Sequence, residues 1–242
     1  MKAHTICYIF LFGMAGSKKG KFIVIEGNDG SGKTTQFKLL LKHLKSKKLQ
    51  VKTMDFPRYY DSFFGKFLAE FMRGEHGKLE NINPYLLTFP FALDRASALK
   101  TINKWRNKGY FLVFNRYVTS NLAHQSGRLP TKKERKKFVD WNMHFEYKIN
   151  KLPKEDIVVF LHVPYKYSLE LMENKSRGER KYMNGNKKDI LEQDLEYIKN
   201  AEIAYLELSK RFSHWIKIEC VKNGKLRSIE DIHEEIKKVL KI

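Results

Sequence analysis

Apolar residues in this sequence gather in five short runs, separated by longer segments with helical periodicity. The first run, residues 22–25, is wholly apolar, a pattern typical of a parallel strand buried on both faces. Later runs rich in β-branched and aromatic residues predict further strands. Their ranges are 49–56, 110–115, 156–163 and 214–220.

Between these strands, apolar positions recur every three to four residues, which predicts helices. After Gly32 the sequence places Phe37, Leu40, Leu41 and Leu44 on one side of a helix. The other helical segments cover residues 84–106, 132–148, 188–212 and 228–242. This alternation predicts an α/β fold, a doubly wound parallel sheet of about five strands flanked by helices. Such sheets bind ligands at the carboxyl ends of their strands.

The first twenty residues differ in character from the rest of the chain. They contain an apolar run of ten residues, 6–15, which is too short to span a bilayer but matches the core of a signal peptide. A polar stretch that begins at Met14 resembles a natural start, so we interpret residues 1–20 as an extension and expect residues 1–13 to be dispensable. A targeting peptide is the alternative. Residues 21–242 contain no linker and predict one domain.

The chain is strongly basic, with 47 lysines and arginines against 27 acidic residues and a net charge of +20. Such a charge raises the affinity for any polyanion, so a nucleic-acid-binding protein is one alternative. Lysine-rich stretches such as residues 131–137 are, however, typical of solvated helix faces, and no aromatic motif of an RNA-binding module accompanies them. Cys7 and Cys220 have no metal-ligand spacing and fit a reducing, cytoplasmic compartment.

A glycine-rich loop follows the first strand and precedes the first helix. It has the spacing Gly27-x-x-x-x-Gly32-Lys33-Thr34, in which the glycines let successive N–H groups converge on an anion. The positive end of the helix faces the same point. The pattern predicts a phosphate-binding loop, with Lys33 on the β- and γ-phosphates and the Thr34 hydroxyl on Mg²⁺. The predicted ATP phosphate-binding residues are Gly27, Asn28, Asp29, Gly30, Ser31, Gly32, Lys33, Thr34 and Thr35.

A phosphate-binding loop by itself is compatible with a kinase, a GTPase or an ATP-driven motor. Residues 186–189 match the Asn-Lys-x-Asp signature of GTPases, but they follow no predicted buried strand and no Asp-x-x-Gly switch is present. Three other segments, residues 55–68, 86–96 and 115–125, lie at a strand end or on a helix that can face the cleft. Taken together, these segments make the chain from Lys21 onward resemble the thymidylate kinases. These enzymes are P-loop nucleoside monophosphate kinases that phosphorylate dTMP.

The resemblance implies a dTMP site in the cleft. Phe91 would stack on the thymine ring, Arg95 would donate to its O4 edge, and Asn121 would pair with N3–H and a neighbouring carbonyl. His124 occupies the position at which the family has a bulky ring beside the sugar 2′ carbon. The predicted dTMP-binding residues are Phe56, Pro57, Arg58, Tyr59, Phe91, Arg95, Arg116, Asn121, His124 and Asp189.

The resemblance also implies a set of polar groups around the acceptor phosphate. Arg116 and Arg58 would clamp it, with Tyr59 adding a hydroxyl, because the planar donors of arginine bind two phosphate oxygens at once. Asp29 resembles the family carboxylate that meets the sugar 3′-hydroxyl and the acceptor phosphate.

Phosphoryl transfer needs positive charge at the moving group, and residues 28–31 of the loop are not basic. The charge must therefore come from another segment. Residues 173–189 correspond to the family's lid and offer two arginines. The predicted catalytic residues are Lys33, Asp29, Arg116, Arg177 and Arg180.

The predicted cofactor is Mg²⁺, bound together with ATP. Thr34 would contact it directly, whereas Asp29 and Asn115 would act through water. The family usually has Asp-Arg-Tyr at the end of the third strand, but here Asn115 stands in the position of the aspartate. A neutral amide can orient a metal-bound water through its oxygen, but it contributes no charge.

The sequence therefore predicts ATP-dependent phosphorylation of dTMP by a cytoplasmic enzyme with ATP and dTMP as its small-molecule substrates. A homodimer is expected from the resemblance and from the apolar helix at residues 86–102, and neither a membrane nor a specific nucleic acid is expected as a partner. A kinase for another deoxynucleoside monophosphate such as dUMP is the alternative, and a basic nucleic-acid-binding P-loop protein is a more remote one.

Overall fold

A computed structural model describes residues 21–173, 183 and 194–242 of the chain. Its main sheet is parallel throughout, with the strand order β2-β3-β1-β4-β5. The strands are β1 (Phe22–Glu26), β2 (Val51–Asp55), β3 (Phe111–Asn115), β4 (Ile157–His162) and β5 (Trp215–Glu219). All five predicted strands are confirmed, and β1 lies in the middle of the sheet with the phosphate loop at its carboxyl end.

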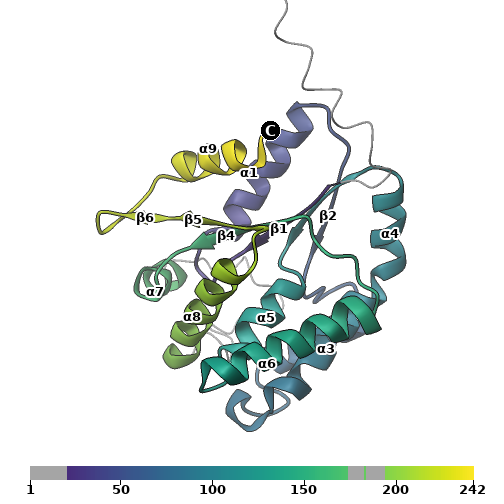
Figure 1. Ribbon diagram of the computed structural model, residues 1–242, viewed down its shortest axis with the longest axis vertical. Coiled ribbons are helices and arrows are strands. Elements are labelled where there is room, and N and C mark those ends of the chain that lie inside the picture. The colour runs from purple at the N-terminus through teal and green to yellow at the C-terminus, as the bar shows by residue number, and fades with distance from the viewer. Residues whose placement is uncertain (1–20, 174–182, 184–193) are drawn as a thin grey trace, which may run out of the picture.

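Helices cover both faces of this sheet, as a doubly wound fold requires (Figure 1). One face carries α1 (Lys33–Ser46) and α9 (Ile229–Leu240), and the opposite face carries α5 (Val118–Ser126), α6 (Lys132–Met143) and α8 (Leu195–Arg211). The remaining helices are α2 (Phe63–Met72), α3 (Pro84–Ser97), α4 (Leu99–Asn107) and α7 (Tyr165–Glu173). Short elements are the turn η2 (Leu79–Asn81), the π-helical turn η3 (His144–Ile149) and the hairpin of β6 (Val221–Lys222) and β7 (Lys225–Leu226).

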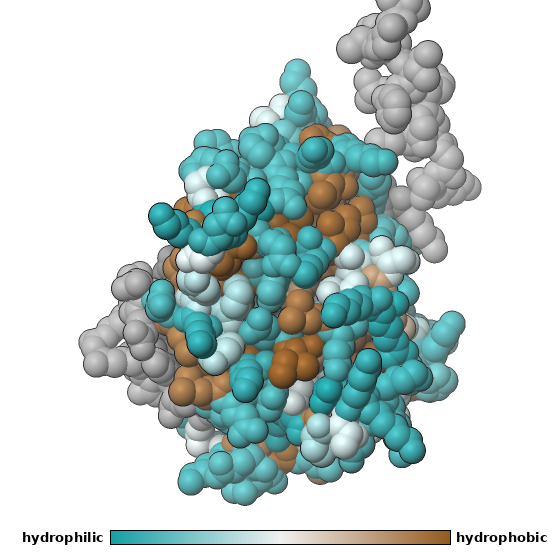
Figure 2. Space-filling view, turned by 60° about the vertical axis from the view of Figure 1, so that its left-hand side comes forward, coloured by the Kyte–Doolittle hydropathy of each residue, from teal (hydrophilic) through white to brown (hydrophobic). Residues whose placement is uncertain are grey.

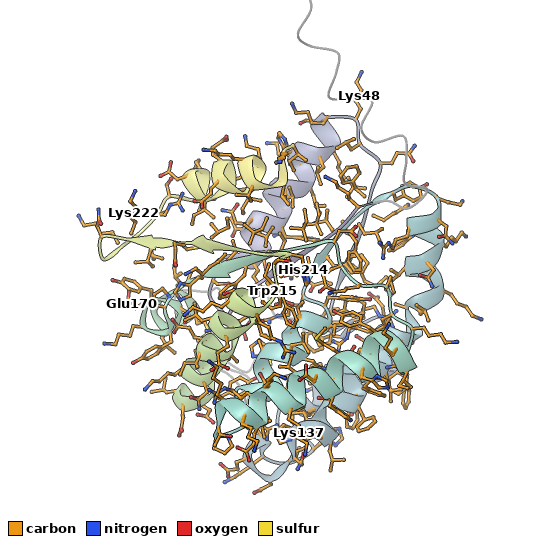
Figure 3. All side chains as sticks on the ribbon, viewed as in Figure 1. Lys48, Lys137, Glu170, His214, Trp215 and Lys222 are labelled. Atoms are coloured by element: carbon orange, nitrogen blue, oxygen red, sulfur yellow. The ribbon has the colours of Figure 1, made fainter. Side chains whose placement is uncertain are left out.

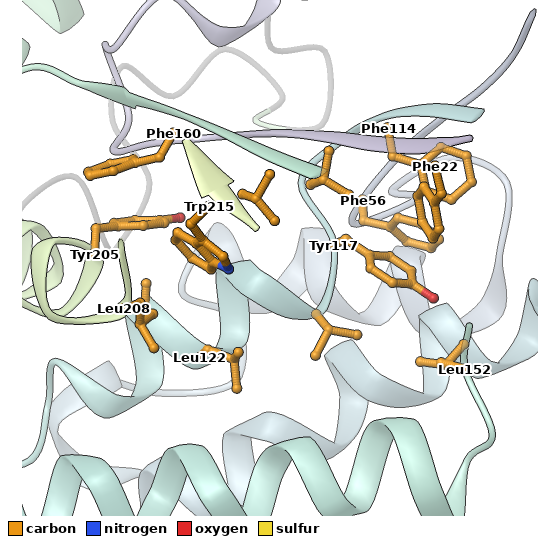
Figure 4. Close-up of a cluster of buried hydrophobic side chains, with 14 of the residues drawn as sticks. Phe22, Phe56, Phe114, Tyr117, Leu122, Leu152, Phe160, Tyr205, Leu208 and Trp215 are labelled. Atoms are coloured by element: carbon orange, nitrogen blue, oxygen red, sulfur yellow. The ribbon is translucent and has the colours of Figure 1, made fainter. Parts of the chain in front are cut away.

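The apolar run of β1 supplies both faces of the core because successive side chains of a strand point to opposite sides. Phe22 and Val24 join the cluster under α5 and α8, whereas Ile23 and Ile25 join the cluster under α1 and α9. The first cluster is rich in aromatic rings (Figure 4). Its labelled members are Phe22, Phe56, Phe114, Tyr117, Leu122, Leu152, Phe160, Tyr205, Leu208 and Trp215.

Several helices differ from the periodicity that predicted them. The segment predicted as one helix over 84–106 is two helices, α3 and α4, which meet at Ala98. The segment predicted over 132–148 becomes the π-helical turn η3 after Met143, and π-turns are frequent at functional sites. The first part of the predicted helix 188–212 lies outside the described residues, and α8 confirms the rest.

Helix α5 was not predicted, because Thr119, Ser120 and Asn121 are weak helix formers. A tertiary contact compensates for their low propensity. The buried Glu26 carboxylate at the end of β1 accepts hydrogen bonds from the Thr119 hydroxyl at 2.6 Å and from the Ser120 hydroxyl at 2.8 Å. The carboxylate thereby attaches the start of α5 to the strand that carries the phosphate loop.

The outer surface accounts for much of the basic charge. The face in Figure 2 is mostly hydrophilic, with smaller hydrophobic areas between. Figure 3 labels Lys48, Lys137 and Lys222 on three separate parts of the fold, and all three are exposed. Over the described part of the chain, no helix combines the length and apolar character that a membrane span requires.

Candidate active site

The predicted phosphate-binding loop connects β1 to α1 as expected. Gly30 has a φ of +80°, and a Cβ at this position would lie 2.4 Å from the Ser168 carbonyl oxygen, so only glycine fits. The Lys33 ammonium lies across the loop and donates to the carbonyl oxygens of Gly27 at 2.9 Å and Asn28 at 2.7 Å. Helix α1 has no acidic residue in its first turn, so its positive end stays uncompensated there.

The loop opens into a cleft of about 390 Å³ at the carboxyl ends of β1, β2 and β3. The cleft is lined by loop residues on one side and by α3, α5 and α8 on the other. Its lining residues are Asp29, Gly30, Ser31, Gly32, Lys33, Thr34, Thr35, Lys38, Asp55, Phe56, Pro57, Tyr59, Met72, Phe91, Arg95, Asn115, Arg116, Tyr117, Ser120, Asn121, His124, Gln125 and Tyr197.

Three polar atoms around the loop are buried and have no hydrogen-bond partner among the described residues. They are Asn28 Oδ1, Ser31 Oγ and Asn115 Oδ1. An unpaired buried polar atom costs about 1–3 kcal/mol, so these atoms indicate a place where a polar ligand completes the network. Both amide oxygens are acceptors, which suits a cation or the water molecules that hydrate it.

Arg116 leaves the end of β3 with a φ of +64°, a left-handed conformation that is uncommon for a residue with a side chain and typical of functional sites. Its guanidinium forms an ion pair with Asp29 and donates to Ser120 Oγ at 3.3 Å and to His124 Nε2 at 2.9 Å. Although burial lowers the pKa of Arg116, nearby negative charge, above all that of Asp29, raises it well above its ordinary value.

His124 is a neutral imidazole at the side of the cleft. Burial, reinforced by the positive charge of Arg116, lowers the pKa of His124 to about 3. Because Nε2 accepts from Arg116, the proton lies on Nδ1, which donates to the Tyr197 hydroxyl at 3.0 Å. The two rings are stacked with centroids 5.7 Å apart, so His124 and Tyr197 form one wall.

The deeper end of the cleft is formed by a buried ion pair. Arg95 and Glu146 share two hydrogen bonds of 2.6 Å, and their side chains are 2% and 0% exposed. Asn121 Nδ2 donates to the same carboxylate at 3.2 Å and to the Thr88 carbonyl at 3.4 Å. These contacts orient Arg95 and Asn121 side by side, close to the partly buried ring of Phe91.

Most residues predicted to bind dTMP line this one cleft. Arg58 does not, because Asp94 on α3 holds its backbone N–H at 2.8 Å and its Nε at 3.0 Å. Its contact with the acceptor phosphate stays a prediction and would require the ion pair to be exchanged. Arg177, Arg180 and Asp189 lie outside the described residues.

Two carboxylates at the site were not predicted. Glu146 belongs to a segment whose charge pattern is that of a solvated helix, so no sequence signal marks it. Asp55 is the last residue of β2, which is a detectable signal because ligands gather at strand ends. Burial raises the pKa of the Asp55 carboxyl, an effect that a hydrogen bond from Asn115 and the charges of Arg116 and Lys33 oppose.

The fold and the site together define a class of protein. A glycine-rich loop at a helix N-terminus, with a lysine across it, opens into a cleft that Arg95 and Arg116 help to line. This is the arrangement of a P-loop nucleotide kinase.

The comparison with known proteins identifies the family within that class. The thymidylate kinase family model matches residues 25–236, and the chain therefore belongs to the thymidylate kinase family. It is 33% identical to a thymidylate kinase of Plasmodium falciparum over 229 residues, which are 93% of this chain and 92% of that one. It is 36% identical to a thymidylate kinase of Mycobacterium tuberculosis over 188 residues, which are 77% and 85% of the two chains.

A solved structure agrees with this assignment at the level of the fold. A thymidylate kinase from Candida albicans superimposes with a TM-score of 0.67 at 20% identity, with 92% of each chain covered. The match to the family model and the identity to these relatives confirm the resemblance inferred from the sequence motifs.

Proposed function

We propose that this protein transfers the γ-phosphoryl group of ATP to dTMP and releases dTDP and ADP. Membership of the family supports this function. The observation that carries it is the buried network beside the cleft, in which Glu146 accepts hydrogen bonds from Arg95 and from the amide of Asn121. A thymine edge offers two carbonyl acceptors and one N–H donor, which match a guanidinium and an amide oxygen.

The phosphate end of the cleft supplies positioning and positive charge. The acceptor is a phosphate oxygen that is largely ionised at neutral pH, so its attack requires alignment rather than a general base. Lys33 exchanges its bonds to the loop carbonyls for bonds to ATP phosphate oxygens, and Arg116 exchanges part of its pairing with Asp29 for the acceptor phosphate.

The donor set around the loop fits magnesium. Thr34 and Asp29 line the cleft, where they would contact the ion directly and through water, and the unpaired Asn115 Oδ1 would accept from a water that hydrates it. When bound with ATP, Mg²⁺ neutralises charge on the β- and γ-phosphates.

An arginine that meets the transferring phosphoryl is still needed, because Lys33 is the only basic residue of the loop itself. Arg177 and Arg180 remain the sequence candidates for this role. Alanine at the acting position should lower kcat by orders of magnitude, whereas alanine at its neighbour should mostly raise KM for ATP. Two alanine variants that both keep kcat within about threefold would contradict the assignment.

The function is tested by coupled ADP release across a panel of nucleoside monophosphates with MgATP. We expect dTMP to be phosphorylated with the highest kcat/KM, because only thymine and uracil carry the edge that Arg95 and Asn121 match. Equal or faster turnover of CMP, AMP or GMP would refute the proposal. Preference for dUMP over dTMP would establish the alternative acceptor.

We also propose that the protein is a homodimer that uses the outer faces of α2 and α3. Leu86, Phe89 and Leu93 form an exposed stripe at helical spacing on α3, and Phe63 and Phe67 are exposed on the adjacent α2. Sedimentation should give a dimer at micromolar concentration, and Leu93→Glu should dissociate it. A monomeric wild-type protein would exclude this interface.

The catalytic unit in this proposal is residues 21–242, and the reaction takes place in the cytoplasm, where ATP is present. A protein that starts at Met14 should therefore fold and turn over like the full chain. Loss of activity on this truncation would show that residues 1–13 are required.

The exposed lysines labelled in Figure 3 lie on three separate parts of the fold, an arrangement that does not favour a nucleic-acid-binding role.

A further inference from the structure

Strand β3, one of the two neighbours of β1 in the sheet, ends without a carboxylate. In P-loop enzymes the nucleotide's magnesium is held by the hydroxyl of the loop and by an aspartate. Here the loop hydroxyl is that of Thr34, but β3 ends in the neutral Asn115. The site therefore needs its negative charge from another residue.

The sheet register places such a charge directly beside Asn115. Asp55, the last residue of β2, is the register partner of Asn115 in the β2–β3 pair. Asn115 Nδ2 donates to Asp55 Oδ1 at 3.0 Å, and both residues line the cleft. The Asp55 side chain is accessible through the cleft opening, whereas Asn115 is 7% exposed.

The direction of this hydrogen bond leaves one polar atom of the pair without a hydrogen-bond partner among the described residues. Because the Asn115 amide nitrogen is turned toward Asp55, its Oδ1 is the buried acceptor that finds no partner in the described part of the chain. A hydrated cation would give this oxygen a water donor and would give the Asp55 carboxylate an opposite charge.

Two other carboxylates near the cleft already have partners in this structure. Asp29 forms an ion pair with Arg116 and lies 3.7 Å from the Lys33 ammonium. Glu26 is fully buried and accepts hydrogen bonds from several donors, including the Tyr205 hydroxyl at 2.8 Å. The charges of Arg116 and Lys33 act on Asp55, but no described lysine, arginine or histidine forms an ion pair with it, so its carboxylate can still contact a metal ion.

We propose that Asp55 supplies the negative charge that holds the magnesium of the bound nucleotide, with Asn115 as the residue that positions it. The carboxylate has thus moved one strand outward, from the end of β3 to the end of β2. This inference rests on the proposed function only in taking MgATP as the phosphoryl donor.

The test measures binding rather than turnover. Calorimetric titration with a non-hydrolysable ATP analogue, once with Mg²⁺ and once with EDTA, is compared for wild type, Asp55→Asn and the exchange variant Asp55→Asn/Asn115→Asp. Asp55→Asn should bind the magnesium complex about tenfold more weakly and the metal-free analogue no more weakly. The exchange variant should recover the affinity for the magnesium complex to within about threefold, because it restores one carboxylate to the pair.

A matched control removes a carboxylate far from the cleft. Glu80→Gln alters an exposed residue near Lys78 and should leave both affinities unchanged. If Asp55 merely repelled phosphate, Asp55→Asn would bind both forms of the analogue more tightly, and this result would overturn the proposal. An unchanged affinity for the magnesium complex would overturn it too.

Two further outcomes keep the test decisive. If Asp55→Asn fails to fold by circular dichroism, the single variant Asn115→Asp replaces it, and its added charge should strengthen binding of the magnesium complex. No gain in that variant would count against the proposal. A wild-type protein that binds MgATP but does not phosphorylate dTMP would refute the proposed function and leave the role of Asp55 to be decided by these titrations.

Discussion

The two ends of the cleft hold their charged side chains in different environments. At the phosphate end, beside the glycine-rich loop, Asp29, Arg116 and Lys33 neutralise one another at a partly open surface, and the proposed function requires them to exchange these partners for substrate. At the base end, where the proposed function places thymine, Arg95 and Glu146 are buried and bonded to each other through two contacts, and we expect them to keep these partners when substrate binds. From this difference we expect the phosphate end to govern the rate of transfer and the base end to govern recognition.

The largest effect should come from the phosphate end. Arg116→Ala removes the planar donors and leaves Asp29 without its partner, so kcat/KM for dTMP should fall about 10³-fold, or about 4 kcal/mol, with most of the loss in kcat. Steady-state kinetics measure this change. Arg116→Lys should recover only part of the loss, since an ammonium lacks the fork of donors.

Arg135→Ala is a suitable control, because Arg135 on α6 pairs with Glu207 on α8 and neither residue lines the cleft. Its kcat/KM should stay within about twofold of wild type. A loss in Arg116→Ala that appeared only as a higher KM would show that Arg116 binds the ground state and the transition state equally. This result would contradict the expectation that the phosphate end governs the rate of transfer.

The base end should respond in stability and in KM. Glu146→Gln leaves Arg95 charged and buried without its counter-ion, so the free energy of unfolding should fall by about 3 kcal/mol. KM for dTMP should rise while kcat stays close to the wild-type value, because Arg95 and Asn121 lose their shared anchor. Urea unfolding and steady-state kinetics measure the two changes.

The chain contains a matched pair for this experiment. Arg135 and Glu207 form the same two-bond geometry at 2.8 and 2.9 Å, but their side chains are 16% and 30% exposed. Glu207→Gln should therefore cost only about 0–1 kcal/mol and leave KM unchanged. Similar losses in Glu146→Gln and Glu207→Gln would mean that burial does not distinguish the two pairs.

The smallest expected effect is a pH dependence at the boundary between the two ends. His124 has a pKa of about 3 in the folded protein, and it faces Arg116, Tyr197 and Tyr205, with Asp29 and Lys33 also acting on its charge. The unfolded chain takes up a proton near pH 6.5, which the folded protein resists. Stability linked to His124 is therefore complete above that pH and declines as the pH falls toward 3.

Between pH 7 and pH 5 this decline should amount to about 2 kcal/mol. Denaturant unfolding of wild type and His124→Gln at both pH values measures it, and the variant should lack this part of the pH dependence. His162, whose pKa is raised by its hydrogen bonds to Glu202 and Glu219 against the effect of burial, contributes with the opposite sign in both proteins and cancels in the difference. Parallel pH profiles for the two proteins would contradict the assignment of a buried neutral His124.

Local sequence patterns predicted the strands and the phosphate loop because both depend on near neighbours. A run such as residues 22–25 can be satisfied only by burial on both faces, and the loop requires glycine, lysine and threonine at fixed spacing. Helix α5 escaped prediction for the opposite reason, since the distant carboxylate of Glu26 stabilises its first turn.

The sequence by itself therefore determined the sheet, the position of the phosphate loop and the residue types that face a nucleotide. Only the tertiary structure decided which charges meet. Glu146 lies 51 residues from Arg95 and reaches it through the π-helical turn, and Asp55 lies 60 residues from Asn115 and reaches it through the register of β2 on β3. Such pairings depend on how separate elements pack, and buried charges are stable only where packing brings an opposite charge or a donor within hydrogen-bond distance.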